Sequence, residues 1–445
     1  MKKIYFLILS AFVGFSCSNQ TELNDIMEST SLPTYQTEGI SRNSNSISES
    51  DALFVASRFM NRPATRSNAS TVTPLRDSEN KLLGHIVNYS DKGFCIVAAS
   101  KESSPILAYS DDNRFDVSSI DKTGVCLWLE NYIYSQNNLT EEKKAINRQQ
   151  WEVYEAAPAI ESRATDDQEK TAAMNKRIGE LYEEFGGGLD ARPLIAYRGS
   201  SMISESLYQL FKNKGGSENY TIVARYKKDL GIKIEPYIKT QWHQEGPFGK
   251  YADNGVAGCT VIAAGQLMYY FQFPTTYDWV AIAKNNFNNE ALSRFSRDVQ
   301  DRFQVTYHYT PIAETSATIS KVKKGLESFG YKISHEKSSS SYRFVYQNHT
   351  PFYEQGIDDA GNGHAWVVDG YNSYDYQYYY VVEYLRGSSG SYYYERDNTT
   401  YSADDGNPAV TYQVHYNWGW GGDNDGYYVS PPTYKNDVQQ LILKH

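Results

Sequence analysis

The sequence predicts an α+β protein in which two folded parts follow an export signal along one chain of 445 residues. Short strand-like segments separated by turn residues occur at residues 82–89 and 93–99, which indicates a hairpin. Charged, helix-favouring sequence follows at residues 138–185. From residue 236 onward the chain is aromatic, glycine-rich and strand-like, with one apolar helix at residues 259–270. Strands and helices that gather in separate runs favour an α+β fold.

The composition excludes several classes of protein. The chain has a formal net charge of −10, 39 tyrosines and 4 cysteines, and 22 % of its residues are charged while 40 % are apolar. These proportions argue against bulk disorder and against a polytopic membrane protein. The acidic balance argues against a nucleic-acid-binding protein, which normally has a basic face. Four cysteines are too few for a disulfide scaffold, so each cysteine is considered singly.

The chain starts with an export signal at residues 1–17. Two lysines precede a short apolar run from Ile4 to Phe15, which is too short to span a bilayer permanently. Cys17 follows a small residue and precedes polar sequence, which resembles a bacterial lipoprotein signal. That resemblance implies lipid attachment to Cys17 and anchoring to the cell envelope, in the outer membrane facing the periplasm or the exterior. Ordinary signal cleavage nearby, with a released product, is the alternative. Residues 18–45 are rich in Ser, Thr and Asn and indicate a flexible tether.

Cys259 has the sequence context of a nucleophile. Glycines end at Gly258, and a nearly all-apolar helix that should be buried begins at the cysteine. A thiol at the amino end of a helix lies among unpaired N–H groups, which lowers its pKa and favours the nucleophilic thiolate. The alternative is that Cys259 packs as a small hydrophobic residue.

A thiolate needs a base, and His364 stands out among the 8 histidines. Glycines at 361 and 363 lead into a continuous apolar strand, so the imidazole should emerge at a strand start beside an open loop. His349, in a polar run, and His415, in an expected strand, are the competitors. Each of the three can instead be an ordinary surface or core histidine.

Three further residues can complete such a site. Asn417 lies at the end of an expected strand, where its side chain can accept from the histidine and fix the ring. The adjoining Trp418 can cover that hydrogen bond from water. Upstream, the amide of Gln244 can point at an oxyanion formed beside Cys259, together with the Cys259 backbone N–H.

In chain order these residues resemble the arrangement of the papain superfamily, and more narrowly the streptopain family of bacterial cysteine peptidases. The matching blocks are Trp-x-Gln-x-x-Pro-Phe at 242–248, Gly-Cys at 258–259, Gly-His-Ala-x-Val-x-Asp-Gly-Tyr at 363–371 and Asn-Trp-Gly-Trp-Gly-Gly at 417–422. The resemblance implies a papain-like catalytic domain at residues 233–445, with a central helix packed on a twisted antiparallel sheet. The roles that it implies are nucleophile for Cys259, general acid/base for His364, orienting residue for Asn417, oxyanion donor for Gln244 and shield of the His–Asn contact for Trp418.

Residues 93–100 and 105–110 resemble the inhibitory prodomain of the same family. The resemblance implies a small α+β prodomain at residues 46–164 that covers the cleft until proteolysis, followed by a connector and activation region at 165–232. Cys95 and Cys126 then lie in the prodomain. They could pair, although reduced, packed thiols are favoured.

The sequence therefore predicts an exported or envelope-anchored cysteine endopeptidase made as a zymogen, with protein substrates and its own prodomain as inhibitor. We expect no cofactor and no metal, because the chain has no His-Glu-x-x-His or Cys-x-x-Cys motif, and residues 423–426 lack the later glutamate of a calcium loop. An amidase or transglutaminase-like acyl-transfer protein, or a non-catalytic protein on the same scaffold, is the alternative. The tyrosine-rich segment 371–411 indicates extended strand surface, or a subsite that stacks against ligands.

Overall fold

We describe the protein from a computed structural model. The described residues are 39–62, 69–155, 165–185, 189–200, 202–229, 231–284, 289–309, 313–337, 341–374, 376–402, 411–430, 435 and 438–445. The predicted signal at 1–17, with its lipid site Cys17, and the tether up to residue 38 lie outside them. In the part of the chain that the structure describes, no helix is both long and apolar enough to cross a membrane.

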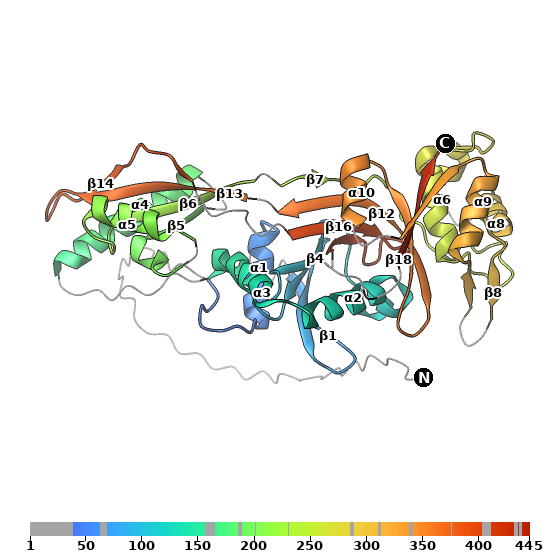
Figure 1. Cartoon of the computed structure of the whole chain (residues 1–445), viewed down its shortest axis with the longest axis horizontal. Coiled ribbons are helices and arrows are strands. Elements are labelled where there is room, and N and C mark those ends of the chain that lie inside the picture. Colours follow the sequence, from blue (N-terminus) through green and yellow to red (C-terminus); the bar gives the residue numbers. More distant parts are fainter. Residues whose placement is uncertain are drawn as a thin grey trace, which may run out of the picture.

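One large antiparallel sheet takes strands from both ends of the chain (Figure 1). Its main path runs β1-β2-β3-β4-β17-β16-β12-β11-β18-β10, and β7 pairs with β12. The strands are β1 (Ala69–Arg76), β2 (Leu82–Tyr89), β3 (Phe94–Ala98), β4 (Ile106–Ser110), β7 (Lys233–Ile234), β10 (Lys332–Lys337), β11 (Phe352–Ile357), β12 (Gly363–Tyr374), β16 (Thr411–Asn417), β17 (Gly426–Val429) and β18 (Val438–Lys444).

The N-terminal part of this sheet carries three helices, α1 (Glu49–Phe59), α2 (Val125–Asn137) and α3 (Glu141–Trp151). The hairpin predicted from the sequence is confirmed, since β2 pairs antiparallel with β3. Helix α1 begins where it does because Ser48 and Asp51 form a capping box that satisfies backbone N–H groups at the helix start. Cys95 is buried in β3 and Cys126 is half-buried in α2, and both are free thiols, as favoured from the sequence.

The N-terminal part joins the C-terminal part at β4 and β17, where Tyr109 pairs with Tyr427 and Ala108 with Tyr428. The rings of Tyr109 and Tyr427 also stack, with centroids 5.1 Å apart. One hydrophobic core contains residues of both parts, from Val55 in α1 to Trp418 after β16. The two parts are therefore a single packed body, and separating them exposes apolar surface on each side.

A group of helices packs on the other end of the sheet: α6 (Cys259–Phe271), α7 (Trp279–Ala283), α8 (Glu290–Phe303) and α9 (Ile319–Ser328). Helix α6 is buried along most of its length and lies against β12 and β11, so the predicted apolar helix is confirmed. A short hairpin of β8 (Thr306–His308) and β9 (Glu314–Ser316) extends from this group, and α10 (Ser341–Asn348) packs on β12 and β16. The fold is α+β, with a central helix against an antiparallel sheet, as predicted.

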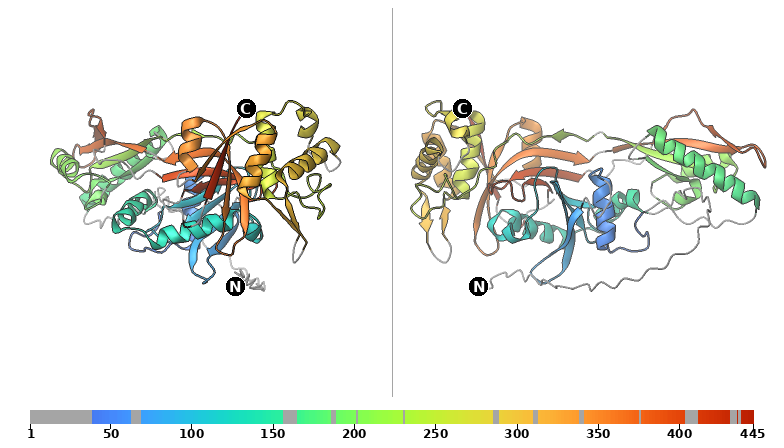
Figure 2. Two further views of the ribbon diagram at one scale, coloured as in Figure 1. Left: turned by 45° about the vertical axis from the view of Figure 1, so that its right-hand side comes forward. Right: turned by 180° about the vertical axis from the view of Figure 1, so that it is seen from behind.

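The segment predicted as a connector at 165–232 is itself folded where the structure describes it. It forms two helices, α4 (Thr165–Phe185) and α5 (Glu205–Gly215), and two strands, β5 (Leu189–Pro193) and β6 (Ile222–Asp229). The two strands belong to a second sheet. The remaining strands come from the tyrosine-rich segment and are β13 (Tyr376–Arg386), β14 (Tyr393–Arg396) and β15 (Tyr401–Ser402). This second unit lies at the opposite end of the molecule from α8 and α9 (Figure 2).

Strand β13 holds the second unit together. It pairs with β6 over eight residue pairs, from Tyr376–Asp229 to Glu383–Ile222. The side chain of Glu383 is only 1 % exposed and accepts hydrogen bonds from Arg177 of α4 and Arg396 of β14. A buried carboxylate between two guanidinium groups ties the helix to both strands.

We expect Glu383→Ala to lower the free energy of unfolding by about 2–4 kcal/mol, because it leaves two guanidinium groups without their buried partner. The matched control is Glu395→Ala, which removes the exposed partner of Arg386 and should cost less than about 1 kcal/mol. Urea unfolding of both variants measures the difference. Equal losses would contradict the role of Glu383.

Candidate active site

Cys259 is the first residue of α6, and the backbone just before it requires glycine. Gly258 has φ +94°, and a Cβ at this position would lie 2.4 Å from the carbonyl oxygen of Thr315. The thiol is half-buried beside β12, where the backbone amide of Ala365 faces it. The nucleophile predicted from the sequence therefore lies at the amino end of a buried helix and next to the strand that carries His364.

The surroundings of Cys259 favour the neutral thiol over the thiolate. Burial raises its pKa, and the charge of Glu314 acts in the same direction. The backbone amides of Ala365, Thr260 and Cys259 itself lower the pKa, as expected for a helix start, but burial outweighs them. The sequence predicted a lowered pKa because it shows the helix terminus and does not show what covers it.

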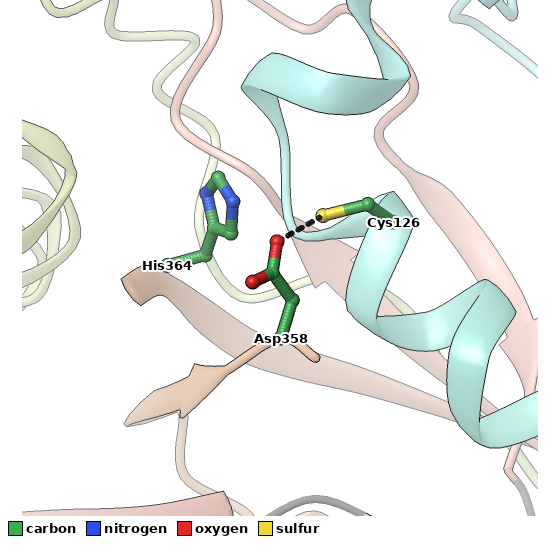
Figure 3. Close-up of side chains that lie close together, drawn as sticks. All are labelled: Cys126, Asp358 and His364. Atoms are coloured by element: carbon green, nitrogen blue, oxygen red, sulfur yellow. Dashed lines mark hydrogen bonds between the residues drawn. The ribbon is translucent and has the colours of Figure 1, made fainter. Parts of the chain in front are cut away.

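His364 is the second residue of β12, opposite Gly356 of β11. Its Nε2 atom is buried and, in the described chain, has no hydrogen-bond partner. Burial lowers the pKa of the imidazole, although Asp358 opposes this shift. The side chains that share its surroundings are Asp358 and Cys126 of α2 (Figure 3), so the base predicted for Cys259 faces a thiol of the N-terminal part.

Asn417 is bonded to residues other than His364. Its Oδ1 accepts from Gln266 Nε2 of α6 at 2.8 Å and from the Gly419 N–H at 3.2 Å, and its Nδ2 donates to the carbonyl of Thr240 at 3.0 Å. Between the described residues, no hydrogen bond joins Asn417 to His364. The predicted orienting contact is therefore not made in this state, and both lone pairs of the amide oxygen are occupied.

Gln266 connects the elements around the site, which the sequence analysis did not identify. Its Oε1 accepts from the hydroxyl of Thr240 at 2.8 Å, and its Nε2 donates to Asn417. The residue lies two turns along α6 from Cys259 and is fully buried. A polar residue inside an otherwise apolar helix was the available signal, because a buried amide requires partners.

Trp418 packs against the N-terminal part. A Cβ on Gly124, which caps α2, would lie 2.4 Å from the ring of Trp418 and 3.0 Å from that of Trp366. The indole Nε1 of Trp418 donates to the carbonyl of Asn424, and its backbone N–H donates to Asp425. In this state Trp418 is thus covered by the start of α2, and a role as shield of a His–Asn contact stays a prediction.

Gln244 is buried close to the approach to Cys259. Its carbonyl accepts from the N–H of Ala257 at 2.8 Å, which fixes the loop two residues before the nucleophile. The neighbouring Trp242 is buried and its carbonyl accepts from the N–H of Gly421. The Gln244 backbone is thereby held beside the start of α6, where a side-chain donor for an oxyanion belongs.

The competing histidines lie elsewhere. His415 is buried in β16, where its Nδ1 lies 2.6 Å from the carboxylate of Asp369 and its ring meets Tyr427 edge-on. Asp369 also accepts from the N–H of Ile238, so this pair fixes backbone segments. His349 is exposed at the end of α10. Neither shares the surroundings of Cys259 or His364.

The turn at residues 423–426 docks the N-terminal part. Asn424 accepts from the N–H of Asp116 at 2.6 Å and donates to the hydroxyl of Ser119 at 2.8 Å. The carbonyl of Asp425 accepts from the side chain of Asn113. Residues 424 and 425 therefore make the polar half of the contact between the two parts, and the packing of Trp418 on Gly124 makes its apolar half.

We expect Gly124→Ala to destabilise the packed chain by about 1–3 kcal/mol, because the added methyl overlaps two tryptophan rings. Gly363→Ala is the matched control, since a Cβ there meets nothing within 4 Å. Urea unfolding followed by tryptophan fluorescence compares the two variants. If both variants unfold at the same midpoint, the close approach of α2 to Trp418 is wrong.

Asp425 should make stability depend on pH. Burial raises its pKa to about 7, while the Trp418 N–H and His415 act against the shift. Because the folded pKa lies above that of the unfolded chain, the group's contribution is most favourable below pH 4 and is lost as the pH rises through 7. The free energy of unfolding of Asp425→Asn, minus that of the unchanged chain, should therefore increase from pH 4.5 to pH 8. Urea unfolding of both proteins at the two pH values measures it. A difference that does not change with pH would contradict the buried carboxyl.

Known proteins resemble both the N-terminal part and the chain as a whole. Residues 44–135 match the model of the Spi protease inhibitor family. Streptopain of Streptococcus pyogenes is 22 % identical over 426 residues, which cover 89 % of this chain and 86 % of that protein, and streptopain of serotype M1 gives the same values. A solved fragment of prointerpain A from Prevotella intermedia aligns with 84 % of this chain and 98 % of its own, at 14 % identity and a TM-score of 0.40.

The inhibitor match falls on the strands and helices that pack over β17, and the streptopain match extends across nearly the whole chain. Both findings agree with the motifs quoted from the sequence. The resemblance to the streptopain family is thereby confirmed: the chain is similar to streptopain over most of its length, and its residues 44–135 match the Spi protease inhibitor family.

Proposed function

We propose that this protein is a cysteine endopeptidase made as a zymogen, with Cys259 as nucleophile and His364 as general acid and base. The observation that carries the proposal is the position of Cys259 at the start of a buried helix, beside the backbone of the strand that presents His364. Such a helix terminus activates a thiol once the groups that bury it have moved.

In the active form, the thiolate of Cys259 attacks the carbonyl carbon of a peptide bond. The backbone N–H of Cys259 and the amide of Gln244 donate to the resulting oxyanion. His364 then gives its proton to the leaving amine, and the acyl part of the substrate stays on Cys259 as a thioester. In the second step His364 removes a proton from the water molecule that hydrolyses this thioester. For Asn417 to orient the ring, its oxygen must exchange the bond from Gln266 or Gly419 for one from His364.

The N-terminal part, residues 46–164, is proposed to keep this machinery latent. The start of α2 lies on Trp418, and Cys126 of the same helix lies beside His364. In this packed state burial raises the pKa of the Cys259 thiol and lowers that of the imidazole, which disfavours the thiolate–imidazolium pair. Removal of this part is therefore the activating event in the proposal.

We further propose that the chain is exported and anchored by a lipid on Cys17, with residues 18–45 as tether and 233–445 as the catalytic domain. The support is the basic start, the short apolar run and the small residue before Cys17. The lipid would hold the enzyme at the envelope, where protein substrates reach it.

Self-processing of the purified full chain tests the proposal. Unchanged chain should be cut, whereas Cys259→Ala and His364→Ala should be slower by about 10⁴-fold or more, because nucleophile and base act as one unit. Gln244→Ala should lower turnover by about 10²–10³-fold. The band of intact chain on denaturing gels gives the rates, and a thiol-directed epoxide identifies the labelled cysteine by mass spectrometry.

Cys95→Ala is the matched control, since it removes a thiol buried in β3 and should process like the unchanged chain. If Cys259→Ala is cut at the rate of the unchanged chain, or if Cys259 is not labelled after the N-terminal part has been removed by an added protease, the protein is not a cysteine peptidase. Labelling without peptide cleavage would assign it to acyl transfer instead.

A further inference from the structure

Three side chains with different metal-binding atoms meet where the N-terminal part covers His364 (Figure 3). Cys126 comes from α2, Asp358 follows β11, and His364 lies near the start of β12. One ligand atom from each lies within 4.8 Å of the other two. Sulfur, nitrogen and oxygen ligands in one place suit a borderline-soft cation such as Zn²⁺, whereas Ca²⁺ and Mg²⁺ prefer oxygen alone.

The buried histidine supplies a second, independent observation. Nε2 of His364 is inaccessible to solvent and has no hydrogen-bond partner in the described residues. A buried nitrogen without a partner loses the hydrogen bond that it had with water, and native structures rarely leave one without a reason. The thiol of Cys126 is a weak donor, and its acceptors among the described residues are the carbonyl of Thr123 at 3.3 Å and the carboxylate of Asp358 at 4.0 Å.

The charges around the cluster favour a cation. Asp358, Glu130 and Asp121 all act electrostatically on the Cys126 thiol. The nearby ammonium of Lys435 is paired with Asp359. The cluster is therefore negatively charged, and within the described residues no lysine or arginine forms an ion pair with its members. A metal ion would supply the missing positive charge.

We infer that Cys126, Asp358 and His364 bind a Zn²⁺-type ion that fastens the N-terminal part to His364. Zinc bonds of about 2.0–2.3 Å set ligand atoms about 3.3–3.8 Å apart, so a pair of ligand atoms that now lie within 4.8 Å closes by at most about 1.5 Å around the ion. Binding replaces the thiol proton, which leaves to solvent, and water takes the fourth position. The sequence analysis predicted no metal site, because Asp358 and His364 lie 232 and 238 residues after Cys126 and no short motif joins the three.

The consequence for regulation rests on the proposed function. A metal on His364 prevents the imidazole from acting on Cys259, so the zymogen would be locked by coordination as well as by packing. The full set of ligands is present only while α2 is docked, because Cys126 belongs to the N-terminal part and Asp358 and His364 to the C-terminal part. Loss of the metal and removal of the N-terminal part would both free the histidine.

Cobalt binding tests the site without using activity. The protein is the full chain with Cys17→Ser and Cys259→Ala, so that Cys95 and Cys126 are its thiols and it cannot process itself. Added Co²⁺ should give a thiolate-to-cobalt charge-transfer band at one ion per chain, which Zn²⁺ displaces. Zn²⁺ should also raise the unfolding temperature of this protein.

Cys126→Ser in this background should abolish the band and the shift in unfolding temperature. Asp358→Asn and His364→Gln should weaken Zn²⁺ binding by at least the 10–100-fold that loss of an outer-shell partner causes. Two matched controls, Cys95→Ala and the exposed His349→Gln, should bind like the parent. A band that is absent from the parent, or that survives Cys126→Ser, overturns the inference.

The outcome is independent of the proposed peptidase function. Because the protein used lacks Cys259, a chain that fails to process itself leaves the metal result unaffected. Conversely, a chain that cuts itself but gives no cobalt band keeps the peptidase proposal and removes the metal site.

Discussion

The pairing of β4 with β17 is the contact on which the rest of the molecule depends. It continues the four N-terminal strands into the strands that carry His364 and Asn417, so that both parts share one sheet and one apolar core. Through this pairing α2 is set against Trp418, and Cys126 against His364. The predicted nucleophile Cys259 packs instead against the apolar core of the C-terminal helices, and burial there is the largest influence on its pKa.

Local features of the fold could be predicted from the sequence. The hairpin of β2 and β3 is encoded by apolar residues around a Ser-Asp-Lys turn, and α6 by glycines that give way to an apolar run. The placement of Cys259 at the helix start needed only this short window. His364 at the beginning of a strand was read from the same kind of evidence, a glycine-rich loop followed by β-branched and aromatic residues.

What the sequence did not disclose depends on partners far apart in the chain. Strand β6 pairs with β13 across 147 to 161 residues of sequence, and nothing in either strand's own sequence identifies the other as its partner. The side-chain partner of Asn417 is Gln266, which lies two turns along α6 from Cys259 and thereby reaches the end of β16. The Cys126–Asp358–His364 cluster arises only when two parts of the chain dock.

The ladder between β6 and β13 also bears on what a cut in the chain can achieve. Strand β6 precedes the region predicted to be catalytic, residues 233–445, yet β13 lies inside that region, and eight residue pairs hold the two strands together. A break between residues 229 and 233 would sever the covalent link while the second sheet kept both pieces in place. Cleavage and dissociation are therefore separate events at this end of the molecule, and a chain that runs as two bands on a denaturing gel can still be one particle in solution.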